Sequence, residues 1–289
     1  MTRPTISVVV NTLNEEKNLP ASLGSVRAWA DEIIVVDMHS DDRTREVAEA
    51  LGAKVFLHER MGFVEPARAF ALSKTSSDWI LILDADELVP APLAERLASV
   101  AREGRDDVVR IPRLNYMMGK PLRYTGWGPA SDAQLRFFRR GMLGTTDQIH
   151  GLLQPRPGAR VSTLPVRDGL ALVHFNYVDL AQFVEKMNRY TTVEAKQAAE
   201  RGERGSIPGS ALRASWEFVD RYVFKRGFLD GWRGFYLSAL MAAYRVSTAA
   251  KLREIRSGAG RAAVEKAYAE VAHDVLAGYP EGARRRSEP

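Results

Sequence analysis

Residues 79–87, with the sequence WILILDADE, decide the fold class, because five apolar residues end abruptly in an Asp-Ala-Asp-Glu sequence. A short, continuous apolar run of this kind is typical of a strand that is buried on both faces. Residues 6–10 and 32–37 form two more such runs earlier in the chain, and each is also followed by polar residues. The first third of the sequence therefore predicts several buried strands with polar ends.

Helical patterns separate these strands. They cover residues 15–29, 43–51, 67–73 and 92–102, and a further short strand is expected at 54–57. Strands that alternate with helices imply a parallel sheet with right-handed crossovers. The sequence thus predicts an α/β, Rossmann-like fold with a mostly parallel sheet flanked by helices.

The second half of the chain has a different pattern. Residues 108–173 contain short strand patterns and loops rich in glycine and proline, and the chain is helical in pattern from residue 180 onward. We expect a catalytic domain over residues 1–178 and a helical C-terminal extension over residues 179–289.

Composition limits the class of protein. The 289 residues are 45% hydrophobic and 27% charged, with a formal net charge of +5 and no cysteine. Disulfides and thiolate metal ligands are therefore excluded. No signal-peptide pattern precedes the first strand, so a cytoplasmic location is expected.

Three predicted strands end in polar clusters, and the carboxyl ends of parallel strands are where such sheets bind ligands. The clusters are residues 11–15, residues 37–42 and the carboxylates Asp84 and Asp86. Part of the second cluster could instead cap the next helix, through Asp42. Two carboxylates that flank one small residue can hold a hard divalent cation, which would bridge diphosphate oxygens. The alternative is a solvated turn.

The chain resembles a family 2 glycosyltransferase with a GT-A fold, in particular bacterial enzymes that add sugars to lipopolysaccharide core or related surface glycans. The resemblance spans residues 5–250. Its residues are Thr12 to Glu16, Ala30 to Asp37, Ser40, Asp42 to Thr44, Gly52 to Val55, Gly62, Phe63, Asp78 to Leu81, Asp84 to Glu87, Ile111 to Arg113, Gly126, Trp127, Gln134 to Arg140, His174, Lys186 and Asn188 to Tyr190.

The resemblance implies a nucleotide-sugar donor, with a UDP-sugar favoured, and gives roles to individual residues. Those expected to bind the nucleotide or donor are Thr12, Asn14, Glu15, Asp37 (at the base), Arg68, Asp84 and Arg136. Asp84 and Asp86 would bind the diphosphate through Mn²⁺ or Mg²⁺, and His150 and His174 are candidates for a further metal contact. A lone histidine is, however, more often structural.

Asp132 follows a glycine-containing loop, where the resemblance implies the catalytic carboxylate. It would take the proton from the acceptor hydroxyl during a single displacement with inversion. The alternative is a loop acid, or an ion-pair partner of Arg136. Arg136 and Arg139 are three residues apart and point to opposite faces of a strand, so one of them is expected to be structural.

The sequence departs from the family pattern at three places. Met38-His39 replaces a glycine-containing turn after the second strand, which leaves the identity of the donor open. Gly151 follows His150 where a glutamate is common, and Ala69 replaces a frequent asparagine.

Residues 221–256 carry eight basic residues among aromatic ones, with an uncharged stretch, 234–244, that is far too short to span a bilayer. Such helices can lie on an anionic membrane surface, here the inner face of the cell membrane. This would suit a lipid-linked acceptor, although a glycan acceptor is equally open. The alternative is packing on the catalytic domain or on another subunit of a homo-oligomer.

Two other classes compete with this interpretation. A nucleotidyltransferase that makes nucleotide-sugars would carry a glycine-rich phosphate loop after the first strand, where this chain has residues 11–15. A non-enzymatic basic binding protein would gather basic, aromatic-flanked patches rather than acidic strand ends, so nucleic acid is not an expected partner.

Overall fold

The computed structural model describes residues 3–60, 65–144, 154–258 and 260–279. The chain divides into two compact units. We call Met1–Leu180 together with Lys225–Gly234 the sheet unit, and Ala181–Phe224 together with Phe235–Pro289 the helical unit. The expected domain boundary at residue 178 stays a prediction.

Four parallel strands form the first half of the sheet, in the order β3-β2-β1-β4. Their bounds are β1 (Ile6–Thr12), β2 (Glu32–Asp37), β3 (Lys54–Leu57) and β4 (Trp79–Asp84). The register pairs Thr12 with Asp37 and Asn11 with Asp84, so the polar ends of β1, β2 and β4 lie level. The predicted α/β class and parallel sheet are confirmed.

The second half of the sheet is mixed and follows the order β4-β8-β6-β12-β5. Strand β8 runs antiparallel to both β4 and β6, whereas β12 runs parallel to β6. The bounds are β5 (Glu87–Leu88), β6 (Val108–Met117), β7 (Lys120–Pro121), β8 (Ala133–Arg139), β9 (Leu143–Gly144), β10 (Gln154–Pro155), β11 (Val161–Thr163) and β12 (Leu172–Tyr177). This half brings residues far apart in sequence beside the end of β4.

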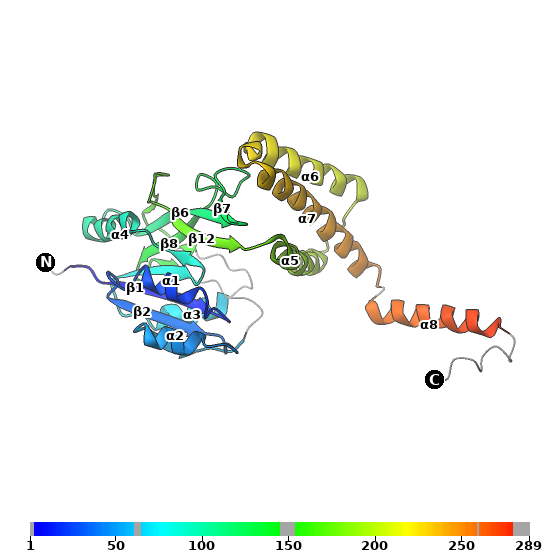
Figure 1. Cartoon of the computed structure of the whole chain (residues 1–289), viewed down its shortest axis with the longest axis horizontal. Helices are drawn as coiled ribbons and strands as arrows, with labels where there is room; N and C mark the ends of the chain where they lie inside the picture. The colour runs from blue at the N-terminus through cyan, green and yellow to red at the C-terminus, as the bar shows by residue number, and fades with distance from the viewer. Residues whose placement is uncertain (1–2, 61–64, 145–153, 259, 280–289) are drawn as a thin grey trace. The chain divides into compact units, whose positions relative to one another are not determined.

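Helices cover both faces of the sheet, as Figure 1 shows. They are α1 (Leu19–Gly24), α2 (Thr44–Ala50), α3 (Glu65–Ser73) and α4 (Ala91–Glu103). Because side chains alternate along β1, Val8 packs in one buried cluster with α1 and α4, and Val9 packs in another with α3. Helix α1 is shorter than the expected 15–29, since turns flank it on both sides.

The helical unit consists mainly of α5 (Leu180–Glu200), α6 (Ile207–Val219), α7 (Trp232–Arg256) and α8 (Arg261–Ala277). A π-helical turn, η1 (Asp220–Phe224), and a 3₁₀ turn, η2 (Gly227–Asp230), interrupt the chain between α6 and α7. Lys251 on α7 donates from Nζ to the Asn188 carbonyl of α5 at 2.7 Å. Across the described residues, the structure has no helix with the length and apolar character that crossing a membrane requires.

Candidate active site

The loops that follow β1 and β2 are tied together by Asn14. Its backbone N–H donates to Ser40 Oγ at 2.8 Å, and its Oδ1 accepts from the Asp41 N–H at 2.8 Å. Asn14 has a φ of 59°, a left-handed conformation that asparagine tolerates better than most residues. Asn14 therefore shapes this edge of the sheet, and donor contact through its side chain stays a prediction.

The Glu15 carboxyl at the same edge has a pKa above its usual value. Burial raises the pKa of the Glu15 carboxyl, a hydrogen bond from Asn18 lowers it, and the carboxylates of Asp86, Asp42 and Asp84 raise it further. The acidic ends of β1, β2 and β4 thus act on one another, and the edge favours a cation.

Asp37, expected to bind the base, is fully buried and already has partners. Its carboxylate accepts from Thr12 Oγ1 at 3.2 Å and from the Ser40 N–H at 2.9 Å. Base recognition by Asp37 or Thr12 stays a prediction. In this structure the Asp37 carboxylate holds the β1 and β2 ends together.

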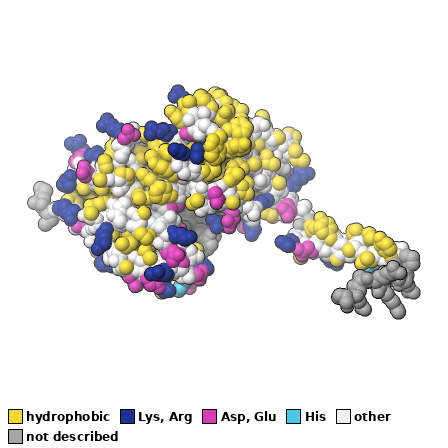
Figure 2. Space-filling model, viewed as in Figure 1, with side chains coloured by type: hydrophobic (Ala, Val, Ile, Leu, Met, Phe, Trp, Pro, Cys, Tyr) yellow, Lys and Arg dark blue, Asp and Glu magenta, His cyan; other side chains and the backbone are white. Residues whose placement is uncertain are grey.

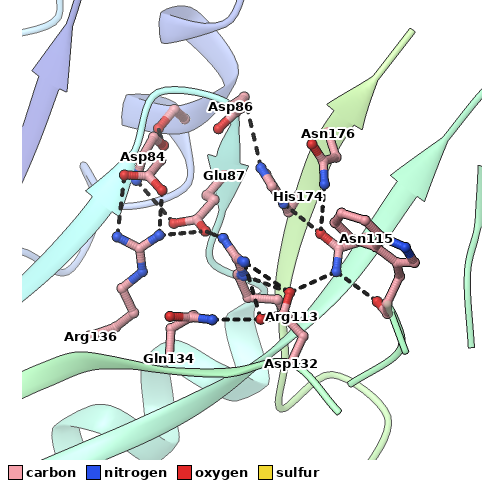
Figure 3. A network of polar contacts seen from close by, with 12 residues as sticks. Asp84, Asp86, Glu87, Arg113, Asn115, Asp132, Gln134, Arg136, His174 and Asn176 are labelled. Atoms are coloured by element: carbon pink, nitrogen blue, oxygen red, sulfur yellow. Dashed lines mark hydrogen bonds and ion pairs between the residues drawn. The ribbon is translucent and has the colours of Figure 1, made fainter. Parts of the chain in front are cut away.

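Asp84 is in contact with two arginines, of which Figure 3 shows Arg136. Arg136 Nη1 donates to Asp84 Oδ1 at 3.2 Å, and Arg68 Nη2 donates to the same oxygen at 2.9 Å. Burial raises the pKa of the Asp84 carboxyl, but Arg136 and Arg68 outweigh it and hold the pKa far below its usual range. Asp84 is thus a permanent carboxylate whose charge is already neutralised by protein cations.

Arg136 connects Asp84 to a second buried acid. Its Nη2 donates to Glu87 Oε1 at 3.0 Å, and Glu87 Oε2 accepts from the Asp84 N–H at 3.0 Å. Arg139 lies away from this cluster, with its Nε 3.4 Å from Asp107 and its guanidinium over the Trp79 ring. Arg136 is therefore the arginine of β8 that belongs to the site.

Asp86 faces His174 rather than an arginine. His174 Nε2 lies 3.4 Å from Asp86 Oδ2, and His174 Nδ1 lies 2.6 Å from Asn115 Oδ1. Asn115 Nδ2 donates to the Trp127 carbonyl and to the Asp132 carboxylate, both pure acceptors, which fixes the amide orientation. Nδ1 then acts as the donor to Asn115 Oδ1, and Nε2 is the ring nitrogen that faces the Asp86 carboxylate. That arrangement suits a proton or a metal ion between the two groups.

Asp132 is surrounded by donors. Arg113 donates to both carboxylate oxygens, from Nε at 3.0 Å and from Nη2 at 3.1 Å. Asn115 Nδ2 and Gln134 Nε2 add hydrogen bonds at 2.8 and 2.7 Å. Burial raises the pKa of the Asp132 carboxyl, but Arg113 and the two amides outweigh it and hold the pKa below its usual range. Its ion-pair partner is Arg113, and Arg136 does not pair with it among the described contacts.

Several residues of this site were not singled out from the sequence. Arg113 and Asn115 are two residues apart on β6, and that spacing could have placed both side chains on one face of the strand. Glu87 directly follows the acidic pair. Asn11 at the end of β1 has both amide atoms buried, and neither has a partner among the described residues. A buried amide without partners is costly, which is a signal for a ligand contact.

Four residues, Asp84, Asp86, His150 and His174, were predicted to bind a metal ion. His150 lies outside the described residues. Within the described ranges, no group of three or more histidine, aspartate or glutamate side chains is placed to hold a metal ion. Asp86 and His174 form a pair, whereas Asp84 is engaged by arginines. The metal roles of these residues stay predictions.

Comparison with known proteins defines the class. Residues 7–162, more than half of the chain, match the profile of Glycosyl transferase family 2. The chain belongs to this family and is a glycosyltransferase, which sets aside the nucleotidyltransferase and the non-enzymatic binder.

Individual relatives agree with this class. An uncharacterized glycosyltransferase of Rickettsia typhi is 28% identical over 86% of this chain and 87% of its own length. The lipopolysaccharide core biosynthesis glycosyltransferase LpsC of Rhizobium meliloti is 28% identical over 86% of this chain and 91% of its own length. The mannosyltransferase PcManGT of Pyrobaculum calidifontis has a TM-score of 0.51 at 19% identity, over 87% of this chain and 88% of that one. This last likeness supports the GT-A fold.

Proposed function

We propose that this chain transfers a sugar, with inversion, from a nucleoside diphosphate sugar to a glycan or lipid-linked acceptor of cell-surface polysaccharide or lipopolysaccharide. The relative LpsC, named for lipopolysaccharide core biosynthesis, supports this class of acceptor. PcManGT was solved with GDP-Man and Mn²⁺, which supports a nucleoside diphosphate sugar as the donor. A UDP-sugar is the favoured donor, and a GDP-sugar is the alternative to test.

The observation that carries the proposal is the pair formed by Asp86 and His174 at the polar edge of the sheet. Asn115 orients the ring so that Nε2 faces Asp86, with Asp86 Oδ2 at 3.4 Å from that atom. Mg²⁺ and Mn²⁺ sites at phosphates commonly use one or two protein ligands and complete the shell with phosphate oxygens and water. Two protein ligands are therefore sufficient for a cation that arrives with the diphosphate, where it would neutralise the leaving group.

The diphosphate of the donor would bind to Arg68 as well as to the cation. Arg68 is partly exposed on α3, and its guanidinium is held 2.9 Å from Asp84. The oxygens of a diphosphate can accept hydrogen bonds from this guanidinium in the same geometry as the carboxylate oxygens do. Asp84 would then exchange one arginine contact for the cation, which reconciles its expected metal role with its present partners. The unpartnered amide of Asn11 is in register with Asp84 and supports a ligand here.

Asp132 is the residue proposed to accept the proton of the acceptor hydroxyl. Although burial raises its pKa, Arg113 and the two amides hold the pKa below the usual range, so the Asp132 side chain is ionised at neutral pH and has the charge that a proton acceptor needs. Four donors occupy its two oxygens, so the acceptor hydroxyl must displace one of them. Gln134 is the expected one to yield, since a single hydrogen bond of 2.7 Å holds it whereas Arg113 binds through two. The hydroxyl oxygen would then attack the sugar opposite the departing diphosphate.

The test is nucleoside diphosphate release from UDP-, GDP- and CDP-sugars in the presence of extracted lipopolysaccharide and lipid-linked glycans. We expect acceptor-dependent release with one nucleotide. Asp132→Asn should lower kcat by about 10²–10⁴-fold, whereas the exposed Asp168→Asn should leave it unchanged. Release that does not depend on any acceptor would contradict the transfer reaction, and an unaltered kcat in Asp132→Asn would remove the base role.

We further propose peripheral contact between the helical unit and an anionic membrane. Leu212, Trp216, Val219 and Val223 follow one another at helical spacing through α6 and η1, and all four are exposed. Figure 2 shows hydrophobic side chains gathered over α6 and the start of α7. Exposed apolar side chains that gather on one face commonly mark interaction surfaces.

A cavity of about 670 Å³ adjoins this stripe within the helical unit. Arg204 and Arg213 line it, and neither has an ion-pair partner among the described residues. Two unpaired guanidiniums beside an apolar stripe suit the phosphate of an anionic headgroup. Trp216→Ser should abolish co-sedimentation with vesicles of phosphatidylglycerol, whereas Leu57→Ser on exposed β3 should not. Unchanged binding in Trp216→Ser, or dimerisation that Trp216→Ser removes, would contradict a membrane role.

A further inference from the structure

The segment Lys225–Gly234 groups with the sheet unit, although it lies between two parts of the helical unit in the sequence. Asp230 in this segment accepts three hydrogen bonds from the loop that follows β7. Its donors are the Arg123 N–H at 3.0 Å, the Tyr124 N–H at 3.1 Å and Thr125 Oγ1 at 2.6 Å. Hydrogen bonds to a charged group are stronger than those between neutral groups, so Asp230 is a firm anchor.

Two further contacts join the segment to the same region. The Thr125 N–H donates to the Lys225 carbonyl at 3.1 Å. Arg233 donates to the Met118 carbonyl from Nε at 3.2 Å and from Nη2 at 2.8 Å. Thr125 is fully buried with a φ of 60°, which is unfavourable for a β-branched residue. The loop therefore depends on contacts from outside itself to keep this conformation.

The loop held by Asp230 reaches the active site through backbone carbonyls. The Trp127 carbonyl accepts from Asn115 Nδ2 at 2.7 Å, and the Gly128 carbonyl accepts from the Asp132 N–H at 3.0 Å. Within the loop, the backbones of Arg123 and Gly128 approach each other closely, because a Cβ added at Gly128 would lie 2.1 Å from the Arg123 carbonyl oxygen. A shift at Arg123 would thus move the carbonyls at 127 and 128.

Asn115 connects the loop to the proposed base, Asp132 (Figure 3). Its Nδ2 donates to Asp132 at 2.8 Å as well as to Trp127, and its Oδ1 faces His174 Nδ1 at 2.6 Å. The Trp127 carbonyl is one of the two acceptors of the Asn115 Nδ2 group, so a shift of this carbonyl would disturb the hydrogen bond from Asn115 to Asp132. The Trp127 N–H donates to the Tyr124 carbonyl at 3.0 Å, so hydrogen bonds and the backbone of the loop connect Asp230 to Asn115 and, through it, to the proposed base.

We propose that Asp230 is a positioning residue, which holds the loop of residues 122–131 so that Asn115 orients Asp132 for sugar transfer. The inference rests on the proposed function, since it assigns Asp230 to the same reaction. It also gives a role to a segment that lies beyond residues 7–162, the part of the chain that matches the family profile. The side chain touches no reacting group itself, so it acts through the loop.

The test compares Asp230→Asn with the exposed Asp274→Asn on α8 as a matched control. The amide keeps the size of the side chain but loses its charge and one acceptor atom. We expect Asp230→Asn to lower kcat at least tenfold, with the KM for the donor and the affinity for nucleoside diphosphate within twofold of the parent. The control should match the parent in all three. Thr125→Val, which removes one donor to Asp230, should give an intermediate loss of kcat.

The outcomes separate this inference from the proposed function. If the parent enzyme transfers no sugar, the proposed function fails. If the parent is active and Asp230→Asn keeps its kcat within twofold, Asp230 positions nothing. A variant that loses kcat, donor affinity and thermal stability together would show a general structural role and overturn the inference. Should Asp230→Asn fail to fold, an unchanged kcat in Thr125→Val would overturn it as well.

Discussion

Arg136→Met should destabilise the sheet unit strongly. The Arg136 side chain is 6% exposed and lies against two carboxylates, and the Glu87 side chain is fully buried. Removal of one partner from a buried ion pair costs about 3–5 kcal/mol, because the remaining charge is left uncompensated. Arg68 stays 2.9 Å from Asp84 and Arg113 stays 3.3 Å from Glu87, so we expect the lower end, about 3 kcal/mol.

Urea unfolding measures this loss, with Arg139→Met as the matched control from the same strand. A slope of about 2 kcal/mol per molar urea converts the loss into a midpoint shift of about 1.5 M. Arg139 is 39% exposed and lies 3.4 Å from Asp107, so its loss should cost less than about 1 kcal/mol. Arg136→Met combined with Glu87→Gln should be less destabilised than Arg136→Met alone. Equal midpoints for the two single arginine variants would refute the reasoning.

Three further outcomes are expected. Burial raises the pKa of Glu32, but Lys54 and neighbouring donors outweigh it and lower the pKa to about 2. The stabilisation of the folded state by the ionised Glu32 is therefore complete above pH 4.5 and is lost as the pH falls toward 2. In denaturation experiments, the loss of unfolding free energy caused by Glu32→Gln should shrink from about 2 kcal/mol at pH 7 to near zero at pH 2. A loss that is the same at both pH values would contradict this expectation. Gly128→Ala should lower the melting temperature by several degrees, because its Cβ would lie 2.1 Å from the Arg123 carbonyl oxygen, and an unchanged melting temperature would argue against this close approach. His174→Ala should weaken Mn²⁺ binding at least about tenfold in spin-resonance titrations, and equal affinity would exclude it as a ligand.

Local sequence patterns were sufficient to predict the strands of the parallel half of the sheet. The runs that became β1, β2 and β4 are continuous and apolar, so burial on both faces follows directly from composition. Their polar ends lie level because parallel strands in one sheet share a direction. The expected helix at 15–29 was too long, since the apolar pattern does not reveal the turns on either side of α1.

The contacts of the site could not be predicted in the same way. Asp84 and Arg136 meet because β8 runs antiparallel beside β4, and 52 residues separate them in the sequence. Nothing local to either residue specifies that pairing or its register. The link between Asp230 and the loop at Thr125 spans 105 residues and depends on a return of the chain to the sheet unit.

The central claim, a cation-dependent nucleotide site at the polar edge of the sheet, is tested most directly by calorimetric titration of UDP and GDP. The titrations are made with Mn²⁺ and with chelator, for the parent protein and for Asp86→Ala. We expect one nucleotide to bind only in the presence of Mn²⁺, and Asp86→Ala to lose that binding. Binding that is the same with chelator and in Asp86→Ala, or no binding of either nucleotide, would contradict the account.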